Sequence, residues 1–202
     1  MIALTLVFVI GILSLFFALW LGKNVLKQDS GTPQMQEIAN AIREGANAFL
    51  YRQYTTIYLL SIVLAAVIFI VYYLLGKNTE GIITSIAFLF GALCSGLSGY
   101  IGMWTAVRAN VRSAAAAKNS LNDSLKVALR GGAVSGIVIV ALSLLGVAGM
   151  YYILNLYGYN VKEIPFLIVG YGFGASFVAL FAQLGGGIYT KSADVGTDLV
   201  GK

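Results

Sequence analysis

Five stretches of the chain contain no charged residue, and this feature limits the possible fold more than any other. They fall at residues 2–21, 56–75, 81–105, 132–156 and 165–189. A transmembrane helix needs about 20 predominantly apolar residues, so each stretch is long enough to cross a bilayer. Charged residues make up only 10% of the chain, whereas soluble domains carry about 25%. The sequence therefore predicts an all-α, polytopic transmembrane helix bundle with five spans.

The first apolar stretch is predicted to be a retained helix rather than a cleaved signal peptide. It has no basic segment before its apolar core, and it is longer than the roughly 7–15 apolar residues of a signal peptide. We therefore count it as the first span.

Residues 33–54 are predicted to form an amphipathic helix at the cytoplasmic surface of the membrane that runs into the second span. Apolar side chains recur there at helical spacing, and charged residues take other positions. We expect this helix to serve packing at the interface. The apolar positions are Met35, Ile38, Ile42, Ala46 and Phe49.

The basic residues predict the orientation of the chain in the membrane. Eleven of the 13 lie on one side of the predicted bilayer, and only Lys77 and Lys162 lie on the other. Cytoplasmic loops carry an excess of Lys and Arg, so the N-terminus is expected outside and residues 190–202 in the cytoplasm. The membrane is the plasma membrane if the source is prokaryotic. Topology then accounts for the net charge of +5, and no nucleic acid is expected as a partner. The basic residues between 108 and 130 could alternatively attract an anionic substrate.

Cysteine and histidine usage excludes several kinds of site. The chain has no histidine, which rules out a His-ligated zinc site or a Ser-His-Asp triad within it. Its one cysteine, Cys94, lies in an apolar stretch and is expected to be a small buried side chain. The candidate functional groups that remain in this chain are carboxylates and lysines.

Such groups gather in the last twelve residues. On an α-helix with Lys191 at zero, Asp194 falls at about 300°, Asp198 at about 340° and Lys202 at about 20°. Two carboxylates and two ammonium groups thus share one narrow face where an apolar helix ends. The face could hold a divalent cation and a phosphate, or it could be a solvated helix end with i,i+4 pairs.

A glycine triplet, Gly185, Gly186 and Gly187, precedes these charges. Glycine costs a helix about 1 kcal/mol relative to alanine at each position, so some other interaction must offset the triplet. Close packing of a neighbouring helix and approach of the backbone to a ligand or ion path both remain open. Glycines inside the third and fifth spans are expected to serve helix packing.

Three segments carry a family resemblance. Residues 181–202 (FAQLGGGIYTKSADVGTDLVGK) resemble the GGG-[IV]-[FY]-TK-x-AD-x-x-ADLVGK signature of the membrane-bound, ion-pumping inorganic pyrophosphatases. Residues 42–50 (IREGANAFL) and 102–112 (GMWTAVRANVR) are also similar to that family in order and spacing. The resemblance implies hydrolysis of pyrophosphate coupled to proton or sodium transport.

The resemblance also implies an architecture. The family forms a bundle of about sixteen transmembrane helices in two rings and works as a homodimer in membrane lipid. This chain would supply the first five helices, so we expect the isolated 202 residues to be inactive. A non-enzymatic five-helix subunit of a transporter or channel is the alternative.

The family likeness further assigns roles to single residues. Lys191 would contact a pyrophosphate oxygen, and Asp194 and Asp198 would help hold Mg²⁺ on the substrate. Lys202 would be a second substrate contact or a partner of a carboxylate, and K⁺ is a possible further cofactor. Gln183 falls at the ion gate, where many members carry Arg, which leaves gating and ion choice open. Thr197 replaces a more usual Ala.

Overall fold

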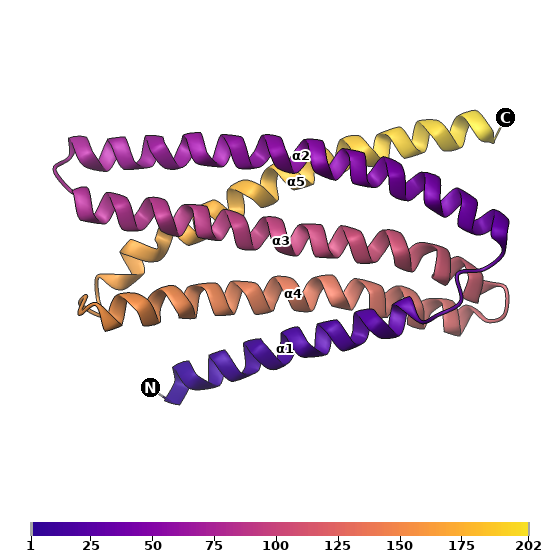
Figure 1. Cartoon of the computed structure of the whole chain (residues 1–202), viewed down its shortest axis with the longest axis horizontal. Coiled ribbons are helices and arrows are strands. Elements are labelled where there is room, and N and C mark those ends of the chain that lie inside the picture. Colours follow the sequence, from indigo (N-terminus) through magenta and orange to yellow (C-terminus); the bar gives the residue numbers. More distant parts are fainter. Residues whose placement is uncertain (1, 202) are drawn as a thin grey trace.

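Residues 2–201 are described by a computed structural model. They form five α-helices joined by short connections, and this part of the chain contains no β-strand (Figure 1). All five helices are long and apolar enough to cross a membrane. The all-α, five-helix prediction is confirmed. The helices are α1 (Ile2–Leu26), α2 (Pro33–Leu74), α3 (Asn78–Ala117), α4 (Leu121–Leu156) and α5 (Ile164–Val200).

Local sequence signals begin and end several of these helices. Thr32 and Ser120 cap α2 and α4, since each side-chain oxygen accepts a hydrogen bond of 3.4 Å from the backbone N–H three residues later. Gly76 and Gly158 follow the ends of α2 and α4 with φ of 75° and 82°. Glycine adopts this left-handed backbone without steric cost, so the chain can leave each helix sharply.

The predicted surface helix and second span form a single helix of 42 residues, α2. The face that its first half buries matches the predicted apolar pattern only in part, since Ala46 of that pattern is buried but its two isoleucines are not. Ala39, Ala46 and Leu50 are buried, whereas Ile38 and Ile42 are 65% and 49% exposed. Close packing favours the small alanines, and none of the described helices covers the two isoleucines. Where the membrane begins along α2 remains a prediction.

The centre of the bundle is α3, which packs against α2, α4 and α5, while α1 packs mainly on α4. In α3, 56% of the most apolar stretch is buried, compared with 33% or less in the other helices. Its contact with α5 is close because glycines bring the two backbones together. A Cβ at Gly174 would overlap the Phe88 carbonyl, and one at Gly91 would overlap the Tyr171 carbonyl. The expected packing role of these glycines is confirmed, whereas Gly172 has no described atom within 4 Å of an added Cβ.

The helices place the two groups of basic residues at opposite ends of the bundle. The C-terminal ends of α1, α3 and α5 lie beside the N-terminal ends of α2 and α4 (Figure 1). The halves of the five helices on this side, with the α1–α2 and α3–α4 connections, carry all the described basic residues except Lys77 and Lys162, which lie in the connections at the opposite end. The charge asymmetry is therefore a property of the folded chain. Which end faces the cytoplasm stays a prediction.

Candidate functional site

The charged residues singled out near the C-terminus lie on one uninterrupted helix. The glycine triplet does not break α5, which continues to Val200 and diverges from α3 and α4 toward its C-terminal end in Figure 1. The helical spacing assumed for Lys191, Asp194 and Asp198 therefore holds. All three residues are exposed. Lys202 lies outside the described residues.

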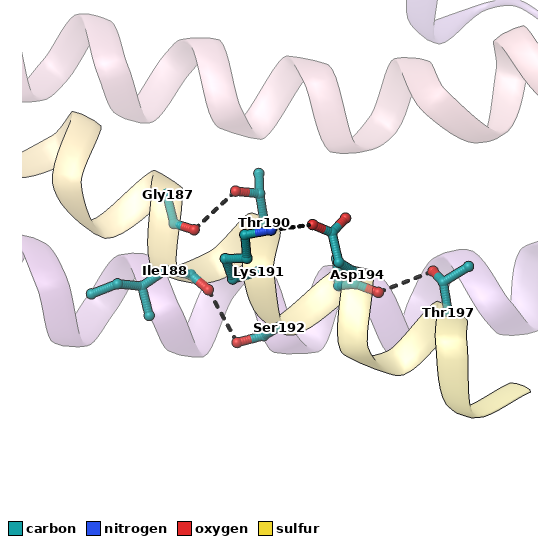
Figure 2. Close-up of polar contacts among 8 residues, drawn as sticks. Gly187, Ile188, Thr190, Lys191, Ser192, Asp194 and Thr197 are labelled. Atoms are coloured by element: carbon teal, nitrogen blue, oxygen red, sulfur yellow. Dashed lines mark hydrogen bonds and ion pairs between the residues drawn. The ribbon is translucent and has the colours of Figure 1, made fainter.

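Lys191 and Asp194 form an exposed ion pair on this helix. The distance from the lysine Nζ to the Asp194 Oδ2 is 3.3 Å, with side-chain exposures of 83% and 65%. Figure 2 shows the pair beside Thr190, Ser192 and Thr197, whose hydroxyls donate to backbone carbonyls of α5 itself at 2.9–3.1 Å. The neighbouring hydroxyls are thus occupied locally. An exposed pair at this spacing contributes only about 0.2–0.5 kcal/mol, so both charges can be redirected to a ligand at low cost.

Asp194 and Asp198 fit a magnesium site in part. Both carboxylates are exposed on one helix face, and Asp198 has no ion-pair partner within residues 2–201. No group of three or more Asp, Glu, His or Cys side chains in that part of the chain could hold a metal ion. Mg²⁺ is usually bound by one or two carboxylates together with phosphate oxygens and waters. The two aspartates fit that pattern with a phosphate ligand present.

Gln183 lies on the same face of α5 but apart from the charged group. Eight residues separate it from Lys191, which corresponds to about 12 Å along the helix axis. Its side chain is exposed and makes no hydrogen bond with the rest of the described chain. The structure therefore does not join Gln183 to the lysine and aspartates in one cluster.

The structure identifies a contact at the glycine triplet that sequence reasoning missed. The Nε2 of Gln53, on α2, donates a hydrogen bond of 2.7 Å to the Phe181 carbonyl, and a Cβ at Gly185 would overlap the Gln53 amide. No described atom lies within 4 Å of a Cβ added at Gly186 or Gly187. Packing against Gln53 thus explains Gly185. A ligand or another segment of the protein could still approach the backbone at Gly186 and Gly187. The only sequence signal for this contact was the amide side chain of Gln53, which lies three residues before the uncharged stretch at 56–75.

A second contact between α2 and α5 lies next to the charged residues. The rings of Phe49 and Tyr189 are 5.1 Å apart between centroids. Phe49 belongs to the segment at residues 42–50, and Tyr189 is two residues before Lys191. The two contacts together hold the base of the exposed α5 segment against α2.

Gly185→Ala is expected to leave the protein about 1 kcal/mol less stable than Gly186→Ala, because the added methyl displaces the Gln53 amide from its hydrogen bond to the Phe181 carbonyl. Thermal unfolding in detergent measures this change. Gly186→Ala is the matched control and should leave stability unchanged or slightly higher. In a Gln53→Ala background the difference between Gly185→Ala and Gly186→Ala should largely disappear, because the hydrogen bond is already absent. A Gly185→Ala protein as stable as the Gly186→Ala control would contradict the contact.

Comparison with known proteins gives one family for nearly the whole chain. The family model described as inorganic H+ pyrophosphatase matches residues 12–202. A K(+)-insensitive pyrophosphate-energized proton pump 2 of Moorella thermoacetica is 57% identical over 95% of the chain. A pyrophosphate-energized membrane proton pump 3 of Arabidopsis thaliana is 48% identical over 97%. A Bacteroides thetaiotaomicron protein, provisionally named a K(+)-stimulated pyrophosphate-energized sodium pump, is 44% identical over 96%.

These matches cover the chain but only part of its relatives. The chain spans 27% of the length of each of these three proteins. The matched part includes all of α2 to α5 and therefore the exposed lysine and aspartates. The chain belongs to the inorganic H+ pyrophosphatase family.

Proposed function

We propose that the chain forms part of an integral membrane pump that hydrolyses inorganic pyrophosphate and couples this reaction to proton or sodium transport. One observation carries the proposal. A chain of this family places Lys191, Asp194 and Asp198 on one exposed face of a helix that continues out of an apolar bundle. The names of its relatives describe pyrophosphate-energized pumps for protons and for sodium.

The exposed charges suit recognition of a metal–pyrophosphate complex. The Lys191 ammonium would donate hydrogen bonds to a pyrophosphate oxygen, and Lys202 would act as a second contact or as a partner of a carboxylate. Asp194 and Asp198 would hold Mg²⁺ through their carboxylate oxygens. Mg²⁺ bound there would neutralise charge on the phosphoryl oxygens.

The remaining parts of the proposal concern coupling and assembly. Gln183 would lie along the ion path, about 12 Å from Lys191, and its neutral amide can donate hydrogen bonds without neutralising a carboxylate. We propose a homodimer of larger helix bundles, with the N-terminus outside and residues 190–202 in the cytoplasm. K⁺ is a possible further cofactor, since relatives are named both K(+)-insensitive and K(+)-stimulated.

The 202 residues alone are expected to be inactive. They correspond to 27% of the length of these relatives, and the proposal is that further metal and substrate ligands come from the other part of the pump. The alternative of a non-enzymatic membrane subunit receives no support from the relatives, whose names describe pumps.

Lys191→Gln tests substrate contact most directly. In the pump expressed from its complete gene, we expect the KM for magnesium pyrophosphate to rise at least about tenfold, because a charge-assisted hydrogen bond to phosphate is lost. Lys126→Gln is the matched control, since Lys126 forms an exposed i,i+3 pair with Asp123 at 3.0 Å. An equal rise in both variants would mean that the basic end of the bundle attracts pyrophosphate diffusely and that Lys191 does not contact it.

A further inference from the structure

A groove between α2 and α3, whose lining includes none of the lysine and aspartates of α5, is lined mainly by aromatic side chains. It encloses a volume of about 620 Å³. One of its ends is formed by Arg108, and most of its length lies along tyrosines and a tryptophan. The residues that matter here are Tyr51, Tyr54, Tyr58, Tyr100, Trp104 and Arg108.

The glycines of α3 shape the apolar part of this groove. A Cβ at Gly96 would overlap the Tyr58 hydroxyl, and one at Gly99 would overlap the Tyr54 hydroxyl. Both tyrosine rings can therefore lie close against α3. Their rings are 6.1 Å apart between centroids, so they form a continuous wall.

Hydrogen bonds to backbone carbonyls hold the guanidinium groups of Arg108 and Arg112 in place beside the groove. The Arg108 guanidinium lies 3.9 Å from the centroid of the Trp104 ring, and its Nη1 donates to the Trp104 carbonyl at 3.1 Å. Arg112, one turn further along α3, donates from Nη1 to the Arg108 carbonyl at 2.8 Å and from Nε to the Leu26 carbonyl at 3.3 Å. Since a guanidinium has five N–H donors, both arginines keep several donors for a ligand.

These arginines and Arg43 of α2 carry positive charge that no carboxylate balances. None of the three forms an ion pair with any residue of the described chain, and the Nε of Arg43 is buried there without a hydrogen-bond partner. Burial, followed by the nearby charge of Arg43, lowers the pKa of both Arg108 and Arg112. Because the three partly buried guanidinium groups repel one another, an anion bound between them would be stabilised electrostatically.

The groove also crosses the boundary between apolar and polar surroundings. Tyr54 lies next to the start of the predicted second span, Trp104 lies at the end of the third, and Arg108 lies just beyond it. Aromatic side chains are favoured at this depth of a membrane, and basic pockets between transmembrane helices bind anionic head groups. A ligand that fits must therefore be anionic at one end and apolar at the other.

We propose that this groove binds one anionic phospholipid, with the phosphate at Arg108 and an acyl chain along Tyr54, Tyr58 and Tyr100. Arg43 and Arg112, each one helical turn beyond the groove lining on α2 and α3, would add positive charge beside the phosphate. A phosphodiester oxygen accepts well from guanidinium groups, and the lipid would supply the negative charge that residues 2–201 do not place there. The main competing occupant is an acidic segment from elsewhere in the pump, and the experiment below separates the two.

The test uses the pump from its complete gene, delipidated in detergent and mixed with phosphatidylglycerol or phosphatidylcholine of identical acyl chains. Native mass spectrometry counts the bound lipids. We expect one phosphatidylglycerol to be retained in preference to phosphatidylcholine. Arg108→Gln should weaken that retention about fivefold, and Arg108→Gln with Arg112→Gln should weaken it about 25-fold.

Two controls keep the result interpretable. Arg130→Gln removes an exposed arginine at the same end of the bundle and should leave lipid retention unchanged. Arg108→Lys keeps the charge and should retain more lipid than Arg108→Gln. Equal retention of phosphatidylglycerol and phosphatidylcholine by the wild-type pump would overturn the proposal without any variant. This result is expected if an acidic segment of the pump neutralises the arginines. An equal loss of lipid in Arg130→Gln would also overturn it.

Discussion

Asp194→Asn and Asp198→Asn are each expected to lower the rate of pyrophosphate hydrolysis about 100-fold or more. Asparagine keeps the size of the side chain but removes the negative charge that would hold Mg²⁺ beside the substrate. Both side chains are exposed, so the fold should survive either change. Phosphate release at saturating magnesium pyrophosphate measures the loss, and a Mg²⁺ titration should show a raised requirement for the metal.

The control for both variants is Asp123→Asn. Asp123 is exposed at the same end of the bundle and pairs with Lys126 at 3.0 Å, much as Asp194 pairs with Lys191. Loss of an exposed pair should cost little stability and no activity. If the Asp194 and Asp198 variants behaved like the Asp123 variant, the proposed metal site would be wrong.

Gly174→Val is expected to destabilise the bundle by at least about 3 kcal/mol. The new side chain would have to occupy the position of the Phe88 carbonyl, and neither helix backbone can move without separating α3 from α5. Because α5 carries the lysine and aspartates, activity should fall together with the folded fraction. The melting temperature and the yield of monodisperse protein in detergent measure the effect.

Gly172→Val is the matched comparison on the same helix. No described atom lies within 4 Å of a Cβ at Gly172, so the described chain gives no reason for a loss of this size. A Gly174→Val protein with wild-type melting temperature would contradict the close contact between α3 and α5.

Apolar length predicted the helices well, because a membrane helix must satisfy its own backbone hydrogen bonds over the full thickness of the bilayer. The face of each helix that is buried was harder to predict. Ile38 and Ile42 belong to the predicted apolar face of α2, yet both are exposed, while Ala39 outside that face is buried. In a mainly apolar chain, hydrophobicity does not separate protein-facing from lipid-facing positions, and small size decides close packing.

In the candidate site, too, the sequence predicted features within one helix but not contacts between helices. Helical spacing correctly placed Lys191, Asp194 and Asp198 on one face, since a regular helix determines their angular separation. It could not reveal that Gln53 contacts the glycine triplet, because that contact joins residues 128 positions apart in the sequence. The roles of the three charged residues remain proposals.

The two proposals involve different groups at the same end of the bundle and fail independently. Loss of lipid retention in Arg108→Gln leaves Lys191, Asp194 and Asp198 intact, so hydrolysis can be measured in the same protein. Conversely, Asp194→Asn should strongly reduce hydrolysis while phosphatidylglycerol remains bound. The two readouts therefore distinguish a lipid site from the reaction site.

The most direct test of the central claim is pyrophosphate-driven ion uptake by vesicles containing the pump from its complete gene. We expect added magnesium pyrophosphate to produce either acidification, seen with a pH-sensitive dye, or accumulation of ²²Na⁺. In the Asp194→Asn variant, hydrolysis and uptake should both fall about 100-fold or more. Hydrolysis without movement of either ion, or undiminished uptake by the Asp194→Asn variant, would contradict the account.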